Sequence, residues 1–234
     1  MEKERKVVLE EISKDLNSPT KIMQDNLNSM LYTTHPYKRN VIGRSDVIET
    51  ITRDQVLSFY NKNYSPSNMV TVIIGDVDAN HAIEKTKEAF NAEYKKQTKT
   101  IYTKEAPLTK QQKKVEYLDT ESGYMVIGFR GTPIDDKDSY ALDVLATILG
   151  DGRSSVLNQV LKEKKRIAFS VDAGNSTFRD DGIFYISANY EPSKCKIVQD
   201  TIFNEIEKIQ KNGVTDDQLK LAKNIIERST YYSR

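Results

Sequence analysis

A lysine- and threonine-rich stretch from 95 to 112 divides the sequence into two parts, and helix and strand patterns restart after it. In both parts these patterns come in blocks rather than in strict alternation, which favours α+β packing. We therefore expect two-layer αβ domains with antiparallel or mixed sheets covered by helices, one within 1–94 and one within 113–234. The stretch between them is typical of a linker.

The first part is predicted to be mainly helical around one apolar strand. Apolar-periodic patterns at 2–14 and 20–31 predict helices, and the capping box Thr52–Gln55 predicts the start of another. The β-branched run at 69–74 predicts a strand that is covered on both faces. A further helix is expected from 80 to about 94.

The second part repeats the strand-then-helix order. Its predicted elements are strands at 113–118 and 123–130, a helix at 137–149, a loop at 150–155, a helix to about 165, strands at 167–173 and 182–190, and two closing helices. The last helix opens with a second capping box, Thr215–Gln218, and its pattern is still running at Arg234. We expect the chain to be a piece of a longer polypeptide.

Composition and charge exclude several classes of function. With 38% hydrophobic and 29% charged residues, the sequence is typical of a globular chain. A net charge of +1 gives no electrostatic reason to expect nucleic acid, and no block of like charge or long apolar run indicates a membrane partner. The single cysteine, Cys195, excludes an internal disulfide and is interpreted as a buried or idle thiol.

No complete active site can be read from the residues. His35 precedes a proline in a turn, where a structural role or exposure is expected. His81 begins a partial His-x-x-Glu-His pattern, but Lys85 stands where the second histidine is needed, so a helix-surface pair is expected. The loop from Gly150 to Ser155, which also contains Gly152, resembles a phosphate cradle but lacks the lysine of a nucleotide-binding loop.

Two glutamates near the start of the chain have a spacing that can serve a metal. Glu4 and Glu11 are seven positions apart, which at about 3.6 residues per turn returns a side chain to nearly the same helix face. One such carboxylate can bind a divalent cation while the other orients a neighbouring ligand. Spacing alone fits equally a surface helix whose glutamates only meet solvent.

Taken together, several short segments resemble the insulinase/pitrilysin family of inverted zinc metallopeptidases, in particular its processing-peptidase branch. Those of the first part are residues 4–12, 35–37, 41–43, 63–70 and 74–78. Those of the second part are residues 128–133, 148–157, 161–164 and 213–219. Each segment alone is weakly specific, but together they keep the family order over essentially the whole chain.

The resemblance implies a zinc site that this chain would only partly supply. Glu11 matches the third zinc ligand of the family, and Glu4 matches a carboxylate that supports the site. The two histidine ligands and the general base of the family lie on an upstream His-x-x-Glu-His helix, which is not in this sequence. We therefore expect zinc in the longer protein, none bound by this chain alone, and no catalysis by this chain alone.

In the second part, the resemblance points to residues that contact a peptide substrate. Gly150 and Gly152 lie where related non-catalytic subunits have a substrate-contacting loop, although a plain helix–helix turn explains the loop equally well. The family usually has an arginine and a tyrosine where this chain has Lys162 and Phe169. Lysine lacks the guanidinium fork and phenylalanine lacks a hydroxyl, so these two are also interpretable as a surface lysine and a core phenylalanine.

Two functions of the longer protein stay open. One is a zinc metalloendopeptidase that cleaves peptides in a closed chamber formed with a second homologous half or subunit, which Glu4 and Glu11 favour. The other is a catalytically inactive partner that binds peptides or scaffolds a complex, which Lys162 and Phe169 favour. An unrelated αβ domain is the remaining alternative.

Overall fold

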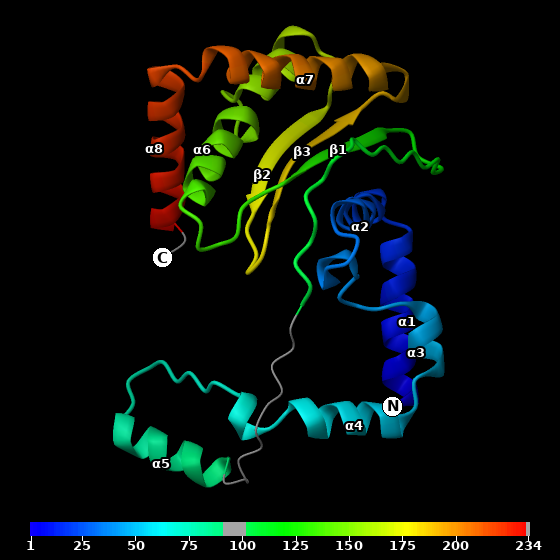
Figure 1. Ribbon diagram of the computed structural model, residues 1–234, viewed down its shortest axis with the longest axis vertical. Helices are drawn as coiled ribbons and strands as arrows, with labels where there is room; N and C mark the ends of the chain where they lie inside the picture. Colours follow the sequence, from blue (N-terminus) through cyan, green and yellow to red (C-terminus); the bar gives the residue numbers. More distant parts are fainter. Residues whose placement is uncertain (91–101, 233–234) are drawn as a thin grey trace. The chain divides into compact units, whose positions relative to one another are not determined.

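The computed structural model describes residues 1–90 and 102–232, and they fall into two compact units (Figure 1). One unit comprises Met1–Ser13 and Val41–Tyr102, and the other comprises Lys14–Asn40 and Thr103–Arg234. This grouping differs from the expected domains at 1–94 and 113–234, because residues 14–40 pack with the C-terminal part of the chain. The domain boundaries themselves stay a prediction, and residues 95–101 of the expected linker lie outside the described residues.

The first unit is built from helices. They are α1 (Glu2–Leu16, whose last three residues belong to the other unit), α3 (Ser45–Thr50), α4 (Arg53–Asn63), a short 3-10 turn (Pro66–Asn68) and α5 (Ala79–Ala89). The capping box predicted for α4 is present, because Gln55 N–H donates to the Thr52 hydroxyl and Thr52 N–H donates to the Gln55 side chain. Asp78 caps α5 by accepting the N–H of His81 at 2.8 Å.

Arg5 joins α1 to the end of α3. Its guanidinium donates to the backbone carbonyls of Ile48, Glu49 and Ile51, the last two at 2.8 and 2.9 Å. These are carbonyls in the last turn and C-cap of α3, which have no partner within that helix. The contact therefore caps α3 and fixes α1 beside it.

The strand predicted at 69–74 is not formed, and that prediction is wrong. The segment is extended but belongs to no sheet. Its apolar side chains are exposed to solvent, Val70 to 91% and Ile74 to 92%. A β-branched run favours an extended backbone, but a strand also needs a neighbour for its backbone hydrogen bonds. Within the described residues no segment pairs with this one.

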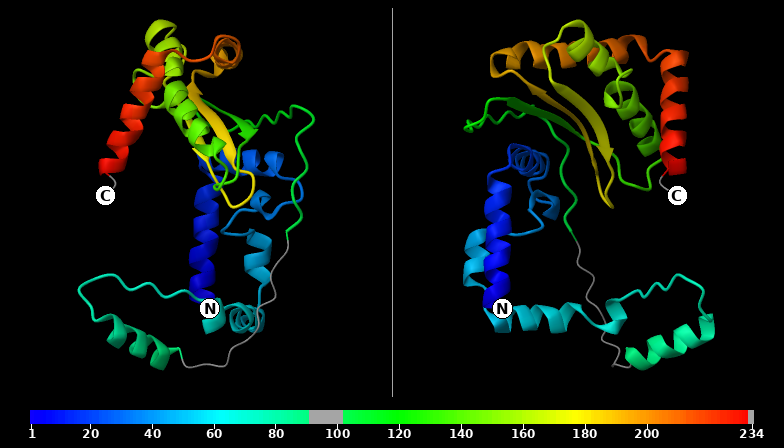
Figure 2. Two further views of the ribbon diagram at one scale, coloured as in Figure 1. Left: turned by 60° about the vertical axis from the view of Figure 1, so that its left-hand side comes forward. Right: turned by 180° about the vertical axis from the view of Figure 1, so that it is seen from behind.

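The second unit contains a sheet with helices on both faces (Figures 1 and 2). Its elements are α2 (Pro19–Leu31), a 3-10 turn (Pro36–Lys38), β1 (Gly123–Arg130), α6 (Asp138–Gly150), a π-helix (Asn158–Lys164), β2 (Ser170–Ser176), β3 (Ile183–Tyr190), a 3-10 turn (Pro192–Lys194), α7 (Cys195–Asn212) and α8 (Asp216–Tyr232). The strand order is β1-β3-β2, with both pairs antiparallel. The predicted α+β class is confirmed.

The main core lies between the sheet and the helices α6 and α7. Alternate residues of β3, including Phe184, Ile186 and Ala188, are buried on this face, and they pack with Leu157, Leu161, Val198 and Ile202, none of which is exposed. Helix α8 lies along α6 and buries Ala222. Removal of this apolar surface from water contributes most of the free energy that stabilises the unit.

The opposite face of the sheet is covered at β1 by α2. Leu27 and Leu31 pack with Ile183, and Gly128 lets Leu27 approach closely, since a Cβ at Gly128 would lie 2.4 Å from the Leu27 side chain. Tyr32 is buried beside them and donates its hydroxyl to the Asp181 carbonyl at 2.7 Å. Residues 14–40 therefore complete the second unit.

Two further sequence predictions differ from the structure. Residues 113–118 form no strand and are exposed, because β1 pairs only with β3 and no other edge receives this segment. The strand expected at 167–173 begins later, at Ser170, because the chain first turns through Arg166, whose φ is +52°. None of the helices within the described residues has the length and apolar character needed to span a bilayer.

Candidate functional site

Glu4 and Glu11 lie on α1, as predicted, and both side chains are exposed. Their seven-residue separation on a continuous helix places them on nearly the same side, about two turns apart. Neither carboxylate makes a hydrogen bond or ion pair with the described residues, so both are available to a ligand.

The described residues do not form a zinc site by themselves. They contain no group of three histidine, cysteine, aspartate or glutamate side chains that could hold a metal ion. Zinc in proteins is held by three or four ligands, and Glu11 supplies one at most. The donor set of the described residues therefore does not fit zinc by itself, and the assignment of Glu11 as a ligand stays a prediction.

His35 is buried and serves the turn at the end of α2. Its Nδ1 accepts the N–H of Tyr37 at 3.3 Å, which leaves Nε2 to carry the proton. Nε2 lies 3.3 Å from the carboxylate of Asp180, in the segment that joins β2 to β3. His35 thus has a structural role, one of the two alternatives expected, and His81 is exposed on α5, as expected of a surface pair.

Glu105 is a buried carboxylate that sequence reasoning missed. It accepts hydrogen bonds from the hydroxyls of Thr33 and Thr34 and from the backbone N–H groups of Thr34 and His35. Burial by itself raises the pKa of Glu105, but these hydrogen bonds outweigh it and hold the pKa well below its usual range. No motif around 105 marks it, because its partners lie some 70 positions earlier.

The loop from Gly150 to Ser155 joins the end of α6 to the π-helix, and its first glycine has a steric cause. A Cβ on Gly150 would lie 2.0 Å from the backbone nitrogen of Ala173 in β2, so only glycine allows this approach. Gly152 has a φ of +75°, a left-handed conformation that also favours glycine. The sequence left open a substrate loop or a plain turn, and both glycines are explained by backbone geometry alone.

Lys162 and Phe169 lie in the chain that connects the Gly150–Ser155 loop to β2. Lys162 is half-buried in the π-helix, a rare form that is frequent at functional sites. Phe169 is 61% exposed, so its interpretation as a core phenylalanine is wrong. Its backbone N–H donates to Asn189 at 2.7 Å, which directs the backbone into the sheet while the ring stays outside.

Asp172 on β2 and Tyr185 on β3 are among the groups of the sheet whose pKa is raised. Partial desolvation raises the pKa of Asp172 although the residue is exposed, the N–H of Ala173 opposes this, and the charge of Asp151 adds to the rise. Burial also raises the pKa of Tyr185, and the negative charge of Asp172 adds to it. Cys195 is half-buried and accepts a hydrogen bond from Tyr190 at 3.3 Å, which fits an idle thiol.

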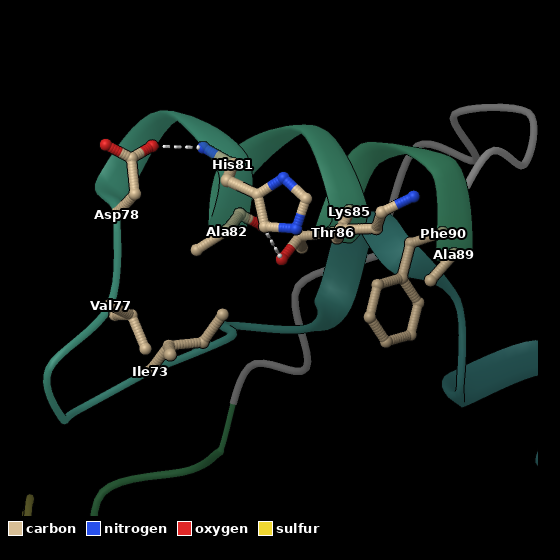
Figure 3. A pocket seen from close by; sticks show the side chains of 9 residues that line it. All are labelled: Ile73, Val77, Asp78, His81, Ala82, Lys85, Thr86, Ala89 and Phe90. Atoms are coloured by element: carbon tan, nitrogen blue, oxygen red, sulfur yellow. Dashed lines mark hydrogen bonds between the residues drawn. The ribbon is translucent and has the colours of Figure 1, made fainter.

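A hollow of about 440 Å³ lies beside α5 in the first unit (Figure 3). Its wall includes Ile73 of the extended segment 69–74, Val77, and Phe90, which directly follows α5. The Asp78 carboxylate at its edge is already used as the α5 cap. None of the site residues expected from the sequence lines this hollow.

The second unit has an α+β fold, an antiparallel sheet with helices on both faces, and comparison with known proteins shows the family to which this fold belongs. Residues 50–226 match the family described as peptidase M16 inactive domain. The chain belongs to this family, which confirms the resemblance drawn from its motifs.

Relatives extend the match over nearly the full chain. An uncharacterised zinc protease of Streptomyces coelicolor is 29% identical over 97% of this chain and 51% of its own length. The zinc protease PqqE of Helicobacter pylori is 30% identical over 92% of this chain and 50% of its own length. A crystal structure of a protease from Helicobacter pylori superposes with a TM-score of 0.87 at 29% identity, over 98% of this chain and 57% of that one. The chain thus spans about half the length of the curated relatives it matches.

Proposed function

We propose that the longer protein to which this chain corresponds is a zinc metalloendopeptidase that cleaves peptides in a closed chamber. In this proposal Glu11 is one zinc ligand, Glu4 supports the site from beside it, and the remaining ligands and the general base come from outside this chain. Membership of the peptidase M16 inactive-domain family and relatives that are named zinc proteases support it.

The single observation that carries the proposal is the pair of carboxylates on α1. Glu4 and Glu11 are exposed on nearly the same side of one helix and have no partner among the described residues. Two unpaired carboxylates in this register are available to ligands that another segment supplies.

The decisive measurement is the zinc content of the longer protein, purified with its natural sequence upstream of residue 1. Glu11→Gln should release most of the metal, because it removes a ligand, whereas Glu4→Gln should weaken binding by about 10- to 100-fold. Glu10→Gln is the matched control, since Glu10 is a neighbouring exposed glutamate on another side of α1. Full zinc occupancy in the Glu11→Gln variant would contradict the proposal.

For this chain alone we propose no tight zinc binding and no catalysis. Zinc affinity comes from assembling preformed ligands, and the described residues contain no group of three donor side chains that could hold the ion. Calorimetric titration of the chain with zinc should show no stoichiometric tight site. A tight site that Glu11→Gln abolishes in this same chain would overturn this part of the proposal.

We propose that the second unit forms a non-catalytic wall that contacts the peptide substrate through Gly152, Lys162 and Phe169, while Gly150, which is buried against β2, fixes the start of the loop. These residues belong to segments that meet at β2, since Gly150 approaches Ala173 and Phe169 directly precedes the strand. The exposed Phe169 ring and the half-buried Lys162 stem give this region apolar and cationic contacts for a peptide.

A catalytically inactive partner subunit is the second candidate, and Lys162 and Phe169 favour it. They replace the arginine and tyrosine that the family resemblance implies, and neither offers the same hydrogen bonds. The two candidates separate in one assay of the longer protein with a quenched fluorescent peptide. Cleavage that is lost on zinc chelation supports the endopeptidase, whereas binding without cleavage supports the inactive partner.

Both candidates require a second homologous half or subunit to close the chamber. We expect the longer protein to pair with another copy or with a related chain, and sedimentation velocity tests this. A strictly monomeric protein that cleaves or binds peptides without a partner would refute the two-subunit arrangement.

A further inference from the structure

We propose that Asn158 is a positioning residue that holds the Gly150–Ser155 loop in one conformation for peptide binding. The inference rests on the proposed role of this loop in contacting substrate. It goes further by assigning the conformation of the loop to one buried side chain, which no motif in the sequence indicates.

The side-chain amide of Asn158 joins three segments. Asn158 is 7% exposed, and its Nδ2 lies within hydrogen-bond distance of the Gly150 carbonyl (3.0 Å), the Ser155 hydroxyl (2.9 Å) and the Val171 carbonyl (3.2 Å), so its two N–H groups are shared among three acceptors. These acceptors belong to the end of α6, the end of the loop and strand β2. One buried amide group therefore ties both ends of the loop to the sheet.

Further hydrogen bonds to the backbone of the loop also hold its conformation. The Ser155 hydroxyl donates to the Gly152 carbonyl at 2.9 Å, and the side chain of Gln159 donates to the Arg153 carbonyl at 3.0 Å. Gly150 is pressed against β2 at a distance that excludes a Cβ. Loss of the Asn158 donors would leave the buried carbonyls of Gly150 and Val171 without this partner, which favours a rearranged loop.

Packing alone does not call for a polar residue at this position. Leu157, directly before the π-helix, and Leu161, within it, are fully buried and provide the apolar contacts with the core. A leucine at 158 would fill a similar volume without the donors. The amide is therefore explained by the hydrogen bonds that it makes to the loop and to β2.

The test compares Asn158→Leu with Thr201→Val in this chain. Thr201 is also buried and polar, but it lies on α7 and its hydroxyl partner is Lys165 rather than the loop. Amide hydrogen exchange reports the order of residues 151–156, and fluorescence anisotropy of a fluorescein-labelled casein peptide reports binding. Because Asn158→Leu could fail to fold, Ser155→Ala, which removes one acceptor of the clamp, is measured in parallel.

We expect Asn158→Leu to accelerate exchange at 151–156 by about 10- to 100-fold while the amides of β3 stay protected, because the loop opens without the core. The peptide Kd should rise by about tenfold, corresponding to about 1.4 kcal/mol. Ser155→Ala should act in the same direction with a smaller effect. Thr201→Val should leave the amide exchange rates of residues 151–156 and the peptide Kd unchanged. All variants are measured at one temperature, below the Tm of each.

Two results would overturn the inference in different ways. Unchanged exchange at 151–156 in both Asn158→Leu and Ser155→Ala would show that Asn158 does not hold the loop. Faster exchange with an unchanged Kd would show that loop order does not matter for the peptide. If the wild-type chain binds no peptide, the proposed function of the loop fails, and the exchange rates still decide whether Asn158 fixes its conformation.

Discussion

The carboxylate of Glu105 accepts the backbone N–H of His35 at 2.7 Å, and this contact ties residues 103–105 to the turn that follows α2. Thr33 and Thr34 complete the arrangement by donating their hydroxyls to the same carboxylate at 2.5 and 3.0 Å. The segment thereby joins the second unit at the point where the chain enters it.

Glu105→Gln should destabilise the second unit by about 2 kcal/mol at neutral pH, because hydrogen bonds to a charged acceptor are replaced by poorer ones. The pKa of Glu105 is lowered by folding, so the stabilisation is present above the unfolded pKa near 4.5 and is lost as the pH falls below it. Urea unfolding of both proteins at pH 7 and pH 3 measures this.

The difference in unfolding free energy between wild type and Glu105→Gln should therefore shrink at the lower pH. Glu191→Gln is the control, since Glu191 is an exposed glutamate whose pKa is also lowered, first by Ser193 and then by Lys194, and should change stability little. A Glu105 difference that grows towards acid would contradict the assignment.

Gly150→Ala should destabilise the chain by about 3 kcal/mol or more, because the new Cβ would meet the backbone of Ala173. Gly152→Ala is the matched variant: nothing lies within 4 Å of its Cβ, so only the left-handed φ is strained, at a cost of about 1 kcal/mol. Thermal melts of the two variants measure the difference. Equal losses would show that the contact between α6 and β2 is looser than described.

Asp172→Asn should stabilise the chain only slightly at neutral pH, because Asp172 is exposed and solvent screens its charge. Folding raises the pKa of Asp172, so its charged form is disfavoured in the folded state, and stability falls as the pH rises through and above the unfolded value of 3.8. The variant should melt above wild type at pH 7 and close to it at pH 3. Asp151→Asn should lower the pKa of Asp172, as followed by NMR titration, and a variant less stable than wild type at pH 7 would refute the argument.

Phe169→Tyr and Lys162→Arg should each change the free energy of unfolding by no more than about 0.5 kcal/mol. The reason is that the Phe169 ring is exposed and the Lys162 side chain is only half-buried. If these positions face the peptide, the added hydroxyl and guanidinium fork should tighten its binding. Anisotropy of the labelled casein peptide measures this, with Phe129→Tyr as an exposed control on β1. Tighter binding of the control alone would place the contact elsewhere.

Local signals in the sequence predicted local structure well. Both halves of the Thr52–Gln55 capping box form, and so do both halves of the box at Thr215–Gln218. The helices α1, α2 and α6 and the strands β1 and β3 begin and end within a few residues of their predicted ranges. These features depend on residues that are close together in the sequence, so hydrophobic periodicity and capping residues are enough to predict them.

Features that depend on distant partners were missed or were wrong. The run at 69–74 has every local mark of a strand, yet strand formation requires an edge that the described chain does not provide. Phe169 is an apolar residue of the kind that usually lies in a core, but after the turn through Arg166 its ring is exposed to solvent. Glu105 and Asn158 carry no motif, because their partners come from separate segments of the fold.

The sequence by itself determined the family, the α+β class, the helical register of Glu4 and Glu11 and the positions of most helices. Only the tertiary structure decided that residues 14–40 complete the second unit, that Gly150 is required by its approach to β2, and that Asn158 clamps the loop. The physical reason is range: propensity and periodicity act over a few residues, whereas steric exclusion and the pairing of buried polar groups depend on which segments the fold brings together.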